Sequence, residues 1–309
     1  MKYCIVVHEL RKILIIVGPT ASGKSALGVI LAKKFNGEII SADSRQVYRG
    51  LNIGTGKITR KEMKGVLHHL LNVASPKRTF TADDFKRQAT KALEDVQGRG
   101  KLPVVVGGTG FYIDSLVGRI SLPNVPPNRK LREKLQKKSA AQLYATLEKK
   151  DPARAHMMIS KSERNNKVRL IRALEVVSAY GKVSMWGVVN PTYDVLWVGI
   201  TPPFTELEKK IAKRLGGRLK KGMVREAQRL HAHGLSYKRM EELGLEYRSL
   251  ARYLQGEVSK EEMQEELGRD IRRYAKKQLM YWKRNKDIQW FKPNQRESIE
   301  RIVRTWLKK

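Results

Sequence analysis

The chain has 309 residues, enough for one large domain or two modest ones with a buried core. Its 63 Lys and Arg against 30 Asp and Glu give a net charge of +33, which favours a polyanionic partner, nucleic acid before a membrane surface. Adaptation to solubility alone would give the same balance and stays open. We expect a cytoplasmic protein, because no segment approaches the ~20 apolar residues of a membrane span and HELRK interrupts the N-terminal apolar stretch. The single cysteine, Cys4, excludes an internal disulfide and is expected to act as a small hydrophobic residue.

The first third of the chain alternates short apolar runs with amphipathic stretches. Apolar runs that end at Gly or polar residues are typical of buried strands, and amphipathic runs opened by a capping residue are typical of helices. The expected elements are a strand at residues 13–17, a helix from Ser25 to Asn36-Gly37, a strand in GEIISADS, a helix opened by the capping box Thr81-Ala-Asp-Asp84 and ended near Gly98 and Gly100, and a strand at residues 102–106. This alternation predicts an α/β fold with a P-loop doubly wound parallel sheet.

The pattern changes at a Pro-rich break, SLPNVPPN, which begins at Ser121. Residues from 129 to about 180 are predicted to be helical, basic and free of strands, whereas residues 193–201 (YDVLWVGIT) are typical of one more core strand. The remainder is predicted to be helical. We therefore expect a core of residues 1–120 and 190–309 with a helical C-terminal region, and an inserted helical subdomain of residues 121–189.

One C-terminal helix, opened by Ser259-Lys-Glu-Glu262, carries charge on one face. Its basic stripe consists of Arg269, Arg272, Arg273, Lys276, Lys277, Lys283 and Arg284. The apolar residues Leu267, Ile271, Tyr274, Ala275, Leu279 and Tyr281-Trp282 fall largely elsewhere around the helix. One face is expected to pack and the other to meet phosphates, with an ordinary solvated face as the alternative.

The segment Gly18-Pro-Thr-Ala-Ser-Gly-Lys-Ser25 fits the pattern GxxxxGKS, with a strand before it and a helix after it. Inward-turned amides and a helix N-terminus make such a loop a phosphate site, in which the lysine adds a full charge and the serine can hold Mg²⁺. The motif does not specify which molecule carries the phosphates. The residues expected to bind a diphosphate are Gly18, Pro19, Thr20, Ala21, Ser22, Gly23, Lys24 and Ser25, and Ser25 is the candidate ligand for Mg²⁺.

Two further motifs follow expected strands. Asp43-Ser-Arg-Gln-Val-Tyr48 places a carboxylate beside the phosphate loop, where it could accept a proton or hold a metal through water; a helix N-cap by Asp43 or Ser44 is the alternative. Gly107-Gly-Thr-Gly110 allows close backbone approach and offers the Thr109 hydroxyl at the same edge, unless it is a plain turn. His68-His69 is not expected to chelate a metal, because adjacent residues of an extended segment point opposite ways.

Six motifs occur together in this order: GPTASGKS, SADSRQVYRGLNIGTGK, HHLL, GGTGFYI, RLIRALEV and YAKKQ. With their spacing they resemble the tRNA dimethylallyltransferase family of the bacterial type, from about Ile13 to Phe291, and ordinary P-loop kinases do not share SADSRQVYR together with GGTGFYI. The resemblance implies that a dimethylallyl group passes from dimethylallyl diphosphate to N6 of an adenosine next to the anticodon, with release of diphosphate and with Mg²⁺ as cofactor. It implies two partners, the anticodon stem-loop of tRNA and dimethylallyl diphosphate, and it implies that the inserted subdomain of residues 121–189 binds tRNA. We expect a monomer.

The resemblance also implies residue roles. Asp43 matches the general base, Thr109 matches a residue near the reacting amine, and Arg214 matches an arginine that binds the diphosphate. The residues that match tRNA contacts are Asp43, Ser44, Arg45, Gln46, Thr109, Lys167, Val168, Arg169, Leu170, Ile171, Tyr247 and Arg248, and the basic stripe adds Arg272, Arg273 and Lys276.

The chain departs from the family pattern at several positions, which affect the details of tRNA contact more than the reaction. Gly56 and Ile58 replace Ala and Pro, Asn72 stands where Asp is common, Arg218 stands near where Met is usual, and Ile271, Lys277 and Met280 replace Thr, Arg and Thr. The lysine at position 277 cannot hold a phosphate in the bidentate manner of arginine.

Three alternatives remain. A small-molecule P-loop kinase and an adenylate isopentenyltransferase both act on small acceptors, and neither needs a charge of +33 or a long basic helix. An RNA-binding NTPase would be expected to carry a metal-binding Asp in a DExx-like context, which is not evident in the sequence.

Overall fold

The computed structural model describes residues 11–156, 158, 161–181 and 193–309. Cys4 and the expected return of the insertion near residue 190 lie outside the described residues. The chain divides into two compact units, one formed by Met1–Val117 with Pro191–Lys309 and the other by Gly118–Asn190. Across the described ranges, no helix has the length and apolar character that crossing a membrane would require.

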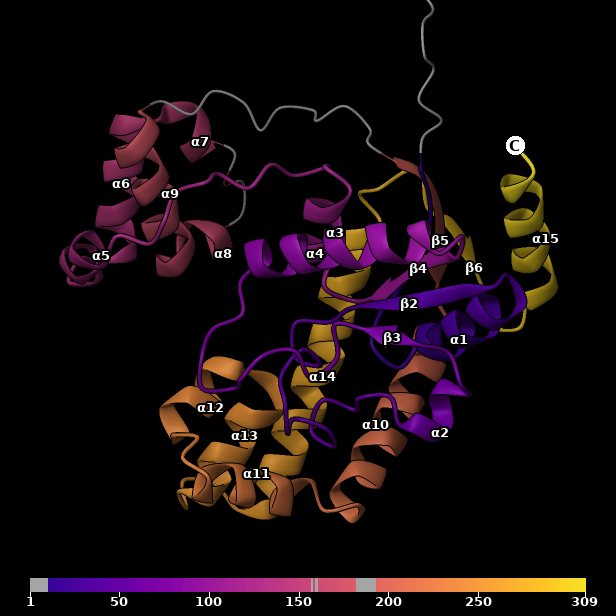
Figure 1. The fold of residues 1–309 in the computed structure, drawn as a ribbon. Helices are drawn as coiled ribbons and strands as arrows, with labels where there is room; N and C mark the ends of the chain where they lie inside the picture. The colour runs from indigo at the N-terminus through magenta and orange to yellow at the C-terminus, as the bar shows by residue number, and fades with distance from the viewer. Residues whose placement is uncertain (1–10, 157, 159–160, 182–192) are drawn as a thin grey trace, which may run out of the picture. The chain divides into compact units, whose positions relative to one another are not determined.

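The first unit is built on a parallel sheet of six strands within the described part of the chain (Figure 1). The strands are β1 (Arg11–Val17), β2 (Gly37–Ala42), β3 (His68–His69), β4 (Leu102–Gly107), β5 (Tyr193–Ile200) and β6 (Gln289–Phe291). Their order is β3-β2-β4-β1-β5-β6, and every described pairing is parallel. The predicted doubly wound α/β fold is confirmed.

The helices of this unit lie on both faces of the sheet and in a C-terminal group. They are α1 (Lys24–Lys34), α2 (Arg60–Met63), α3 (Ala82–Gly98), α4 (Gly110–Leu116), α10 (Phe204–Lys220), α11 (Met223–Ala232), α12 (Tyr237–Leu243), α13 (Leu245–Leu254), α14 (Lys260–Trp282) and α15 (Arg296–Leu307). The capping box predicted at Thr81 opens α3, and the helix expected after Ser259 is α14, which also begins with a capping box. The expectation that the chain after β5 is entirely helical is wrong, because β6 adds a strand beside β5.

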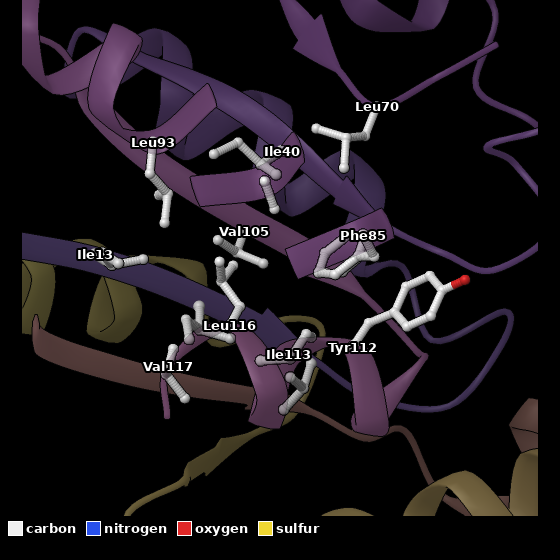
Figure 2. Close-up of a cluster of buried hydrophobic side chains, with 14 of the residues drawn as sticks. Ile13, Ile40, Leu70, Phe85, Leu93, Val105, Tyr112, Ile113, Leu116 and Val117 are labelled. Atoms are coloured by element: carbon white, nitrogen blue, oxygen red, sulfur yellow. The ribbon is translucent and has the colours of Figure 1, made fainter. Parts of the chain in front are cut away.

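Alternate residues of the buried strands belong to two hydrophobic cores, one on each face of the sheet. Ile13, Ile15 and Val17 of β1 face α3 and α4, where Phe85 stacks on Tyr112 with ring centroids 4.3 Å apart (Figure 2). Leu14 and Ile16 face α1 and α15 on the other side. Because both faces are covered, β1 is apolar throughout, as is typical of a central parallel strand.

The C-terminal helices form a third core of their own. Buried residues of α10 to α14 pack together with Val47, Tyr48 and Leu51, which follow β2. The chain after Asp43 is therefore held against the helices that carry the basic stripe.

The described residues of the second unit contain helices from Arg129 onward and no strand, as predicted. Its helices are α5 (Arg129–Gln136), α6 (Ala140–Lys150), α7 (Pro152–His156), α8 (Lys161–Arg164) and α9 (Lys167–Tyr180). The buried Glu175 accepts hydrogen bonds from Arg132 Nε and Nη2 at 2.7 and 2.8 Å and from the Asn128 amide at 2.9 Å. This bidentate ion pair joins α5 to α9.

Candidate active site

The phosphate loop, residues 18–25, connects β1 to α1 in a conformation suited to anions. A Cβ on Gly18 would lie 2.3 Å from the Ile200 carbonyl oxygen, so the loop runs too close to β5 for any other residue. Ala21 and Gly23 have φ of 63° and 96°, in the left-handed region. The helix begins at Lys24, and its first amides are left to bind a ligand.

The ammonium group of Lys24 is held by the backbone of this loop. Its Nζ donates to the Pro19 carbonyl at 3.1 Å. Burial lowers the pKa of the Lys24 ammonium to about 8, against the opposing effect of the Asp43 carboxylate and with the help of the Arg214 charge. The amine is thus short of anionic partners, which a bound diphosphate would supply.

A cavity at the carboxyl end of the sheet brings some of the predicted catalytic and phosphate-binding residues together, although Thr109 is not among the residues that line it. Lys24 and Ser25 line it from the phosphate loop, Asp43 from the end of β2, and Arg214 from α10. Its other lining residues are Thr20, Ile39, Ser41, Gln46, Thr55, Gly56, Ile58, His68, Val106 and Gly107. Residues far apart in the sequence therefore share one polar cavity.

Asp43 and Thr109 come from adjacent strands and meet at the same edge. Asp43 Oδ1 accepts hydrogen bonds from the amides of Arg45 and Gln46 at 2.8 and 3.2 Å, so the carboxylate holds a turn, not the N-terminus of a helix. Thr109 Oγ1 accepts from the Ser44 amide at 3.0 Å. The hydroxyl thus fixes the backbone directly after Asp43.

The glycines around Thr109 make room for the chain's own elements. A Cβ on Gly107 would lie 2.1 Å from the Ala42 carbonyl oxygen, and one on Gly110 would lie 2.0 Å from Cε1 of Tyr281 on α14. The expected close approach to this turn is present, and it is made by the backbone of β2 and by a side chain of α14. The turn is therefore more than a plain connection between β4 and α4.

The departures at Gly56, Ile58, Asn72 and Arg218 gather around one loop next to the cavity. A Cβ on Gly56 would lie 2.9 Å from Arg214 Nη2, so the guanidinium occupies the place of a side chain. Asn72 Oδ1 accepts from Lys57 Nζ at 2.6 Å. Arg218 Nη1 donates to the Gly54 carbonyl at 2.6 Å and pairs with Glu246 at 2.9 Å.

Three residues near the site were not identified from the sequence. Glu226 is buried and binds the backbone of the loop that contains Gly56. Tyr274 of α14 has a raised pKa because it is buried and close to the Asp43 charge, so its phenol stays protonated. Gln278, four residues later, bonds to two loops of the site. Helical spacing alone could have placed Glu226 on the buried face with Met223 and Ala227.

The two adjacent histidines have different surroundings, as expected. His68 lines the cavity and its ring Nδ1 donates to the Val66 carbonyl at 2.8 Å, whereas His69 Nε2 bonds to the buried Glu38 at 2.7 Å. Among the residues that the structure describes, no group of three or more His, Cys, Asp or Glu could hold a metal.

Three of the residues that match tRNA contacts have buried side chains, and their contact with tRNA stays a prediction. Tyr247 is 1% exposed and its hydroxyl donates to Glu226, while the neighbouring Arg248 is exposed. Leu170 and Ile171 belong to the core of the second unit. Exposed surface is provided there by Lys167, Val168 and Arg169, which are at the start of α9.

The two faces of α14 are as predicted. Its buried residues include Met263, Leu267, Ile271, Ala275 and Trp282. On the basic stripe, Arg273 pairs with Asp270 at 3.1 Å, Arg272 lies 3.8 Å from Glu208, and Lys276 lies 4.7 Å from the centroid of the Phe204 ring. These local contacts leave the stripe accessible, and its contact with phosphates stays a prediction.

Comparison with known proteins decides the family. A family model described as IPP transferase matches residues 46–286, which is more than half of the chain. The chain belongs to the IPP transferase family. Curated relatives include tRNA dimethylallyltransferase 2 of Citrifermentans bemidjiense, 42% identical over 90% of this chain and 88% of the relative, and tRNA dimethylallyltransferase of Pelotomaculum thermopropionicum, 38% identical over 92% of each.

Solved structures of IPP transferases have the same fold. The full-length tRNA isopentenylpyrophosphate transferase of Bacillus halodurans is 32% identical, with a TM-score of 0.73 over 97% of both chains. A eukaryotic dimethylallyltransferase described as acting on tRNA is 26% identical, with a TM-score of 0.76 over 91% of this chain and 74% of its own. The family similarity thus extends over nearly the whole chain.

Proposed function

We propose that this protein transfers a dimethylallyl group from dimethylallyl diphosphate to N6 of an adenosine next to the anticodon of tRNA, and releases diphosphate. The observation that carries this proposal is the cavity at the sheet edge that Lys24, Asp43 and Arg214 line together. Thr109 lies next to it, bound through its hydroxyl to the amide of the residue after Asp43. Relatives at 35–42% identity are named for dimethylallyl transfer to tRNA. These names argue against a small-molecule kinase, an adenylate isopentenyltransferase and an NTPase without transfer chemistry.

The phosphate loop would bind the leaving group. Its amides and the N-terminus of α1 face the diphosphate, and the charges of Lys24 and Arg214 oppose the negative charge that grows as the carbon–oxygen bond breaks. The phosphates depart as diphosphate and are not transferred. This use of the loop requires no γ-phosphate.

Asp43 would act as the general base. The N6 amine becomes acidic as it is alkylated, so a carboxylate within hydrogen-bond reach can remove the proton as the new C–N bond forms. The two amide bonds to Oδ1 fix the orientation of the carboxylate. Thr109 accepts a hydrogen bond from the amide that follows Asp43, and we propose that it would lie near the same amine.

The loop also fits Mg²⁺. Ser25 is exposed at the start of α1 and lines the cavity, and Mg²⁺ in phosphate loops takes few protein ligands and fills its shell with phosphate oxygens and water. We propose that Ser25 Oγ would hold the ion. Bound there, Mg²⁺ supplies neutralisation of the diphosphate charge.

The RNA would approach over basic side chains around the cavity. A Cβ on Gly244 would lie 3.8 Å from Arg45 Nη2 and 3.9 Å from Arg248 Nη2. The two guanidinium groups therefore form a local cationic cluster. With Ser44, Gln46 and the stripe on α14 they would hold the phosphate backbone. Extracting an adenine from a loop costs less than from a duplex, which suits an anticodon-loop target. We further propose that the protein works in the cytoplasm as a monomer.

Mass analysis of tRNA tests the function. After incubation with dimethylallyl diphosphate and Mg²⁺, nuclease digests should contain one adenosine heavier by a single C5 unit. Robust formation of ADP from ATP with small acceptors, without a modified tRNA, would instead support a kinase.

Binding of dimethylallyl diphosphate should weaken as the pH rises above about 8. The pKa of Lys24 in the free site is about 8, lowered from 10.5, and the bound diphosphate favours the ammonium. Below this pH, Lys24 is already charged before the diphosphate binds. Above it, the Lys24 amine must take up a proton on binding, which lowers the affinity by up to tenfold per pH unit. Calorimetry between pH 7 and 9.5 in two buffers of different ionisation enthalpy measures both effects.

The matched variant for this experiment is Lys24→Met. It should bind the diphosphate weakly at every pH and show no proton uptake. An affinity of the unmodified protein that stays constant across this range would show that Lys24 is not the group that titrates.

Replacing Arg272 and Arg273 by alanine should weaken tRNA binding and flatten its salt dependence. Each phosphate contact adds about 0.7–0.9 to the slope of log affinity against log salt, so the slope should fall by about 1–2. Filter binding at several salt concentrations measures it. The control changes the exposed Arg301 and Arg304 of α15, with the same loss of charge. Equal slopes for both double variants would mean that the stripe is only a solvated face.

A further inference from the structure

Gln278 of α14 bonds to two loops of the site. Its Oε1 accepts the Thr20 amide of the phosphate loop at 2.8 Å, and its Nε2 donates to the Gly108 carbonyl, next to Thr109, at 3.1 Å. The side chain is 7% exposed, so water does not compete for these bonds. One carboxamide thus connects the loop that would hold the donor to the turn that would face the acceptor.

The surrounding geometry is fitted to this contact. A Cβ on Gly108 would lie 2.1 Å from Gln278 Nε2, so the backbone of the turn must be bare for the amide to reach it. One turn further along α14, the Tyr281 hydroxyl donates to Asp114 Oδ2 at 2.5 Å, and its ring covers Gly110. The helix is therefore held against the turn at two successive positions of one face.

A carboxamide satisfies both partners at once. The Thr20 amide requires an acceptor and the Gly108 carbonyl requires a donor, and glutamine presents one of each in a fixed plane. An ionised glutamate of the same shape would keep the first bond and lose the second. A methionine of similar volume would lose both.

We infer that Gln278 is a positioning residue that sets the phosphate loop and the Thr109 turn at the separation required for transfer. This inference rests on the proposed function. It assigns Gln278 no contact with either substrate. Because a misplacement of about 1 Å between reacting groups can lower a rate by about 10²-fold, loss of the bridge should affect kcat far more than substrate binding.

The test compares Gln278→Glu and Gln278→Met with Gln264→Glu, a change of the same charge at an exposed position of α14. Under saturating substrates, the single-turnover rate of prenyl transfer should fall by about 10²-fold in both Gln278 variants, with the tRNA Kd within about threefold of the unmodified protein. In Gln278→Glu the loss should shrink as the pH falls, because a protonated carboxyl can donate to Gly108 again. Unchanged rates in the folded Gln278 variants would overturn the inference.

Hydrogen exchange provides a readout that does not depend on the reaction. Amides of residues 18–25 and 107–112 should exchange faster in both Gln278 variants than in Gln264→Glu. The unmodified protein could make no prenylated tRNA while these amides still exchange faster in the Gln278 variants. The proposed function would then fail, whereas the role of Gln278 in holding the two loops would stand. If exchange is unchanged, the bridge does not hold the loops and the inference fails.

Discussion

Prenyl transfer by the Asp43→Asn variant should be slower than that of the unmodified protein by about 10²–10⁴-fold, the usual contribution of a general base. Asparagine keeps an oxygen that can accept the amides of Arg45 and Gln46, so the turn should survive while the capacity to take a proton is lost. The rate is measured in a single turnover and the tRNA Kd by filter binding. The Kd should change little, because the surrounding cations remain.

Two further variants separate chemistry from structure. Asp43→Ala should abolish transfer as well, and should also lower the free energy of unfolding by about 1 kcal/mol, because the turn loses its capping oxygen. Asp83→Asn, at an exposed position of α3, removes the same charge and should leave the rate unchanged. Turnover that persists in Asp43→Asn would mean that another group removes the proton.

The second large effect is expected at Glu226, on stability. This carboxylate is 1% exposed and accepts the amides of Asn52, Ile53 and Gly54 at 2.8–3.0 Å and the Tyr247 hydroxyl at 2.8 Å. Glu226→Ala leaves four donors without their acceptor, and two of them, the Gly54 amide and the Tyr247 hydroxyl, are buried. Since each costs about 1–3 kcal/mol and losses within a network are not additive, we expect a total loss of about 3–5 kcal/mol.

Urea unfolding of the Glu226 variants measures this loss. Glu226→Gln keeps the shape of the side chain, but its NH2 group cannot accept hydrogen bonds from the backbone amides. Its free energy of unfolding should therefore lie between those of the alanine variant and the unmodified protein. Glu241→Ala, at an exposed position of α12, is the control. Equal stability of Glu226→Ala and Glu241→Ala would show that water replaces the carboxylate and that the loop does not depend on it.

Local signals in the sequence were enough to predict most of the first unit's sheet. Capping residues such as Thr81 and apolar runs such as that of β1 depend on their neighbours in the chain. β6 was missed because a three-residue strand is recognisable only by its pairing with β5, far away in the sequence. Its half-exposed residues carry no strong pattern of their own.

The same distinction applies to the site. Asp43 and Thr109 follow predicted strands, so their convergence could be expected from the rules of parallel sheets. Gln278 could not be identified in this way, because its partners Thr20 and Gly108 are brought to it only by the tertiary fold. The burial of Tyr247 against Glu226 could not be expected from its motif, because the next residue, Arg248, is exposed.

The position of β1 has a consequence for synthesis of the chain. β1 is the first described strand, yet it lies between β4 and β5, and β5 is translated only after the whole second unit. Until residues 193–200 have left the ribosome, one edge of this apolar strand has no native partner. Unpaired apolar edges are templates for aggregation. We therefore expect nascent chains that end within the second unit to bind chaperones. Chains in which β5 has left the ribosome should no longer need them.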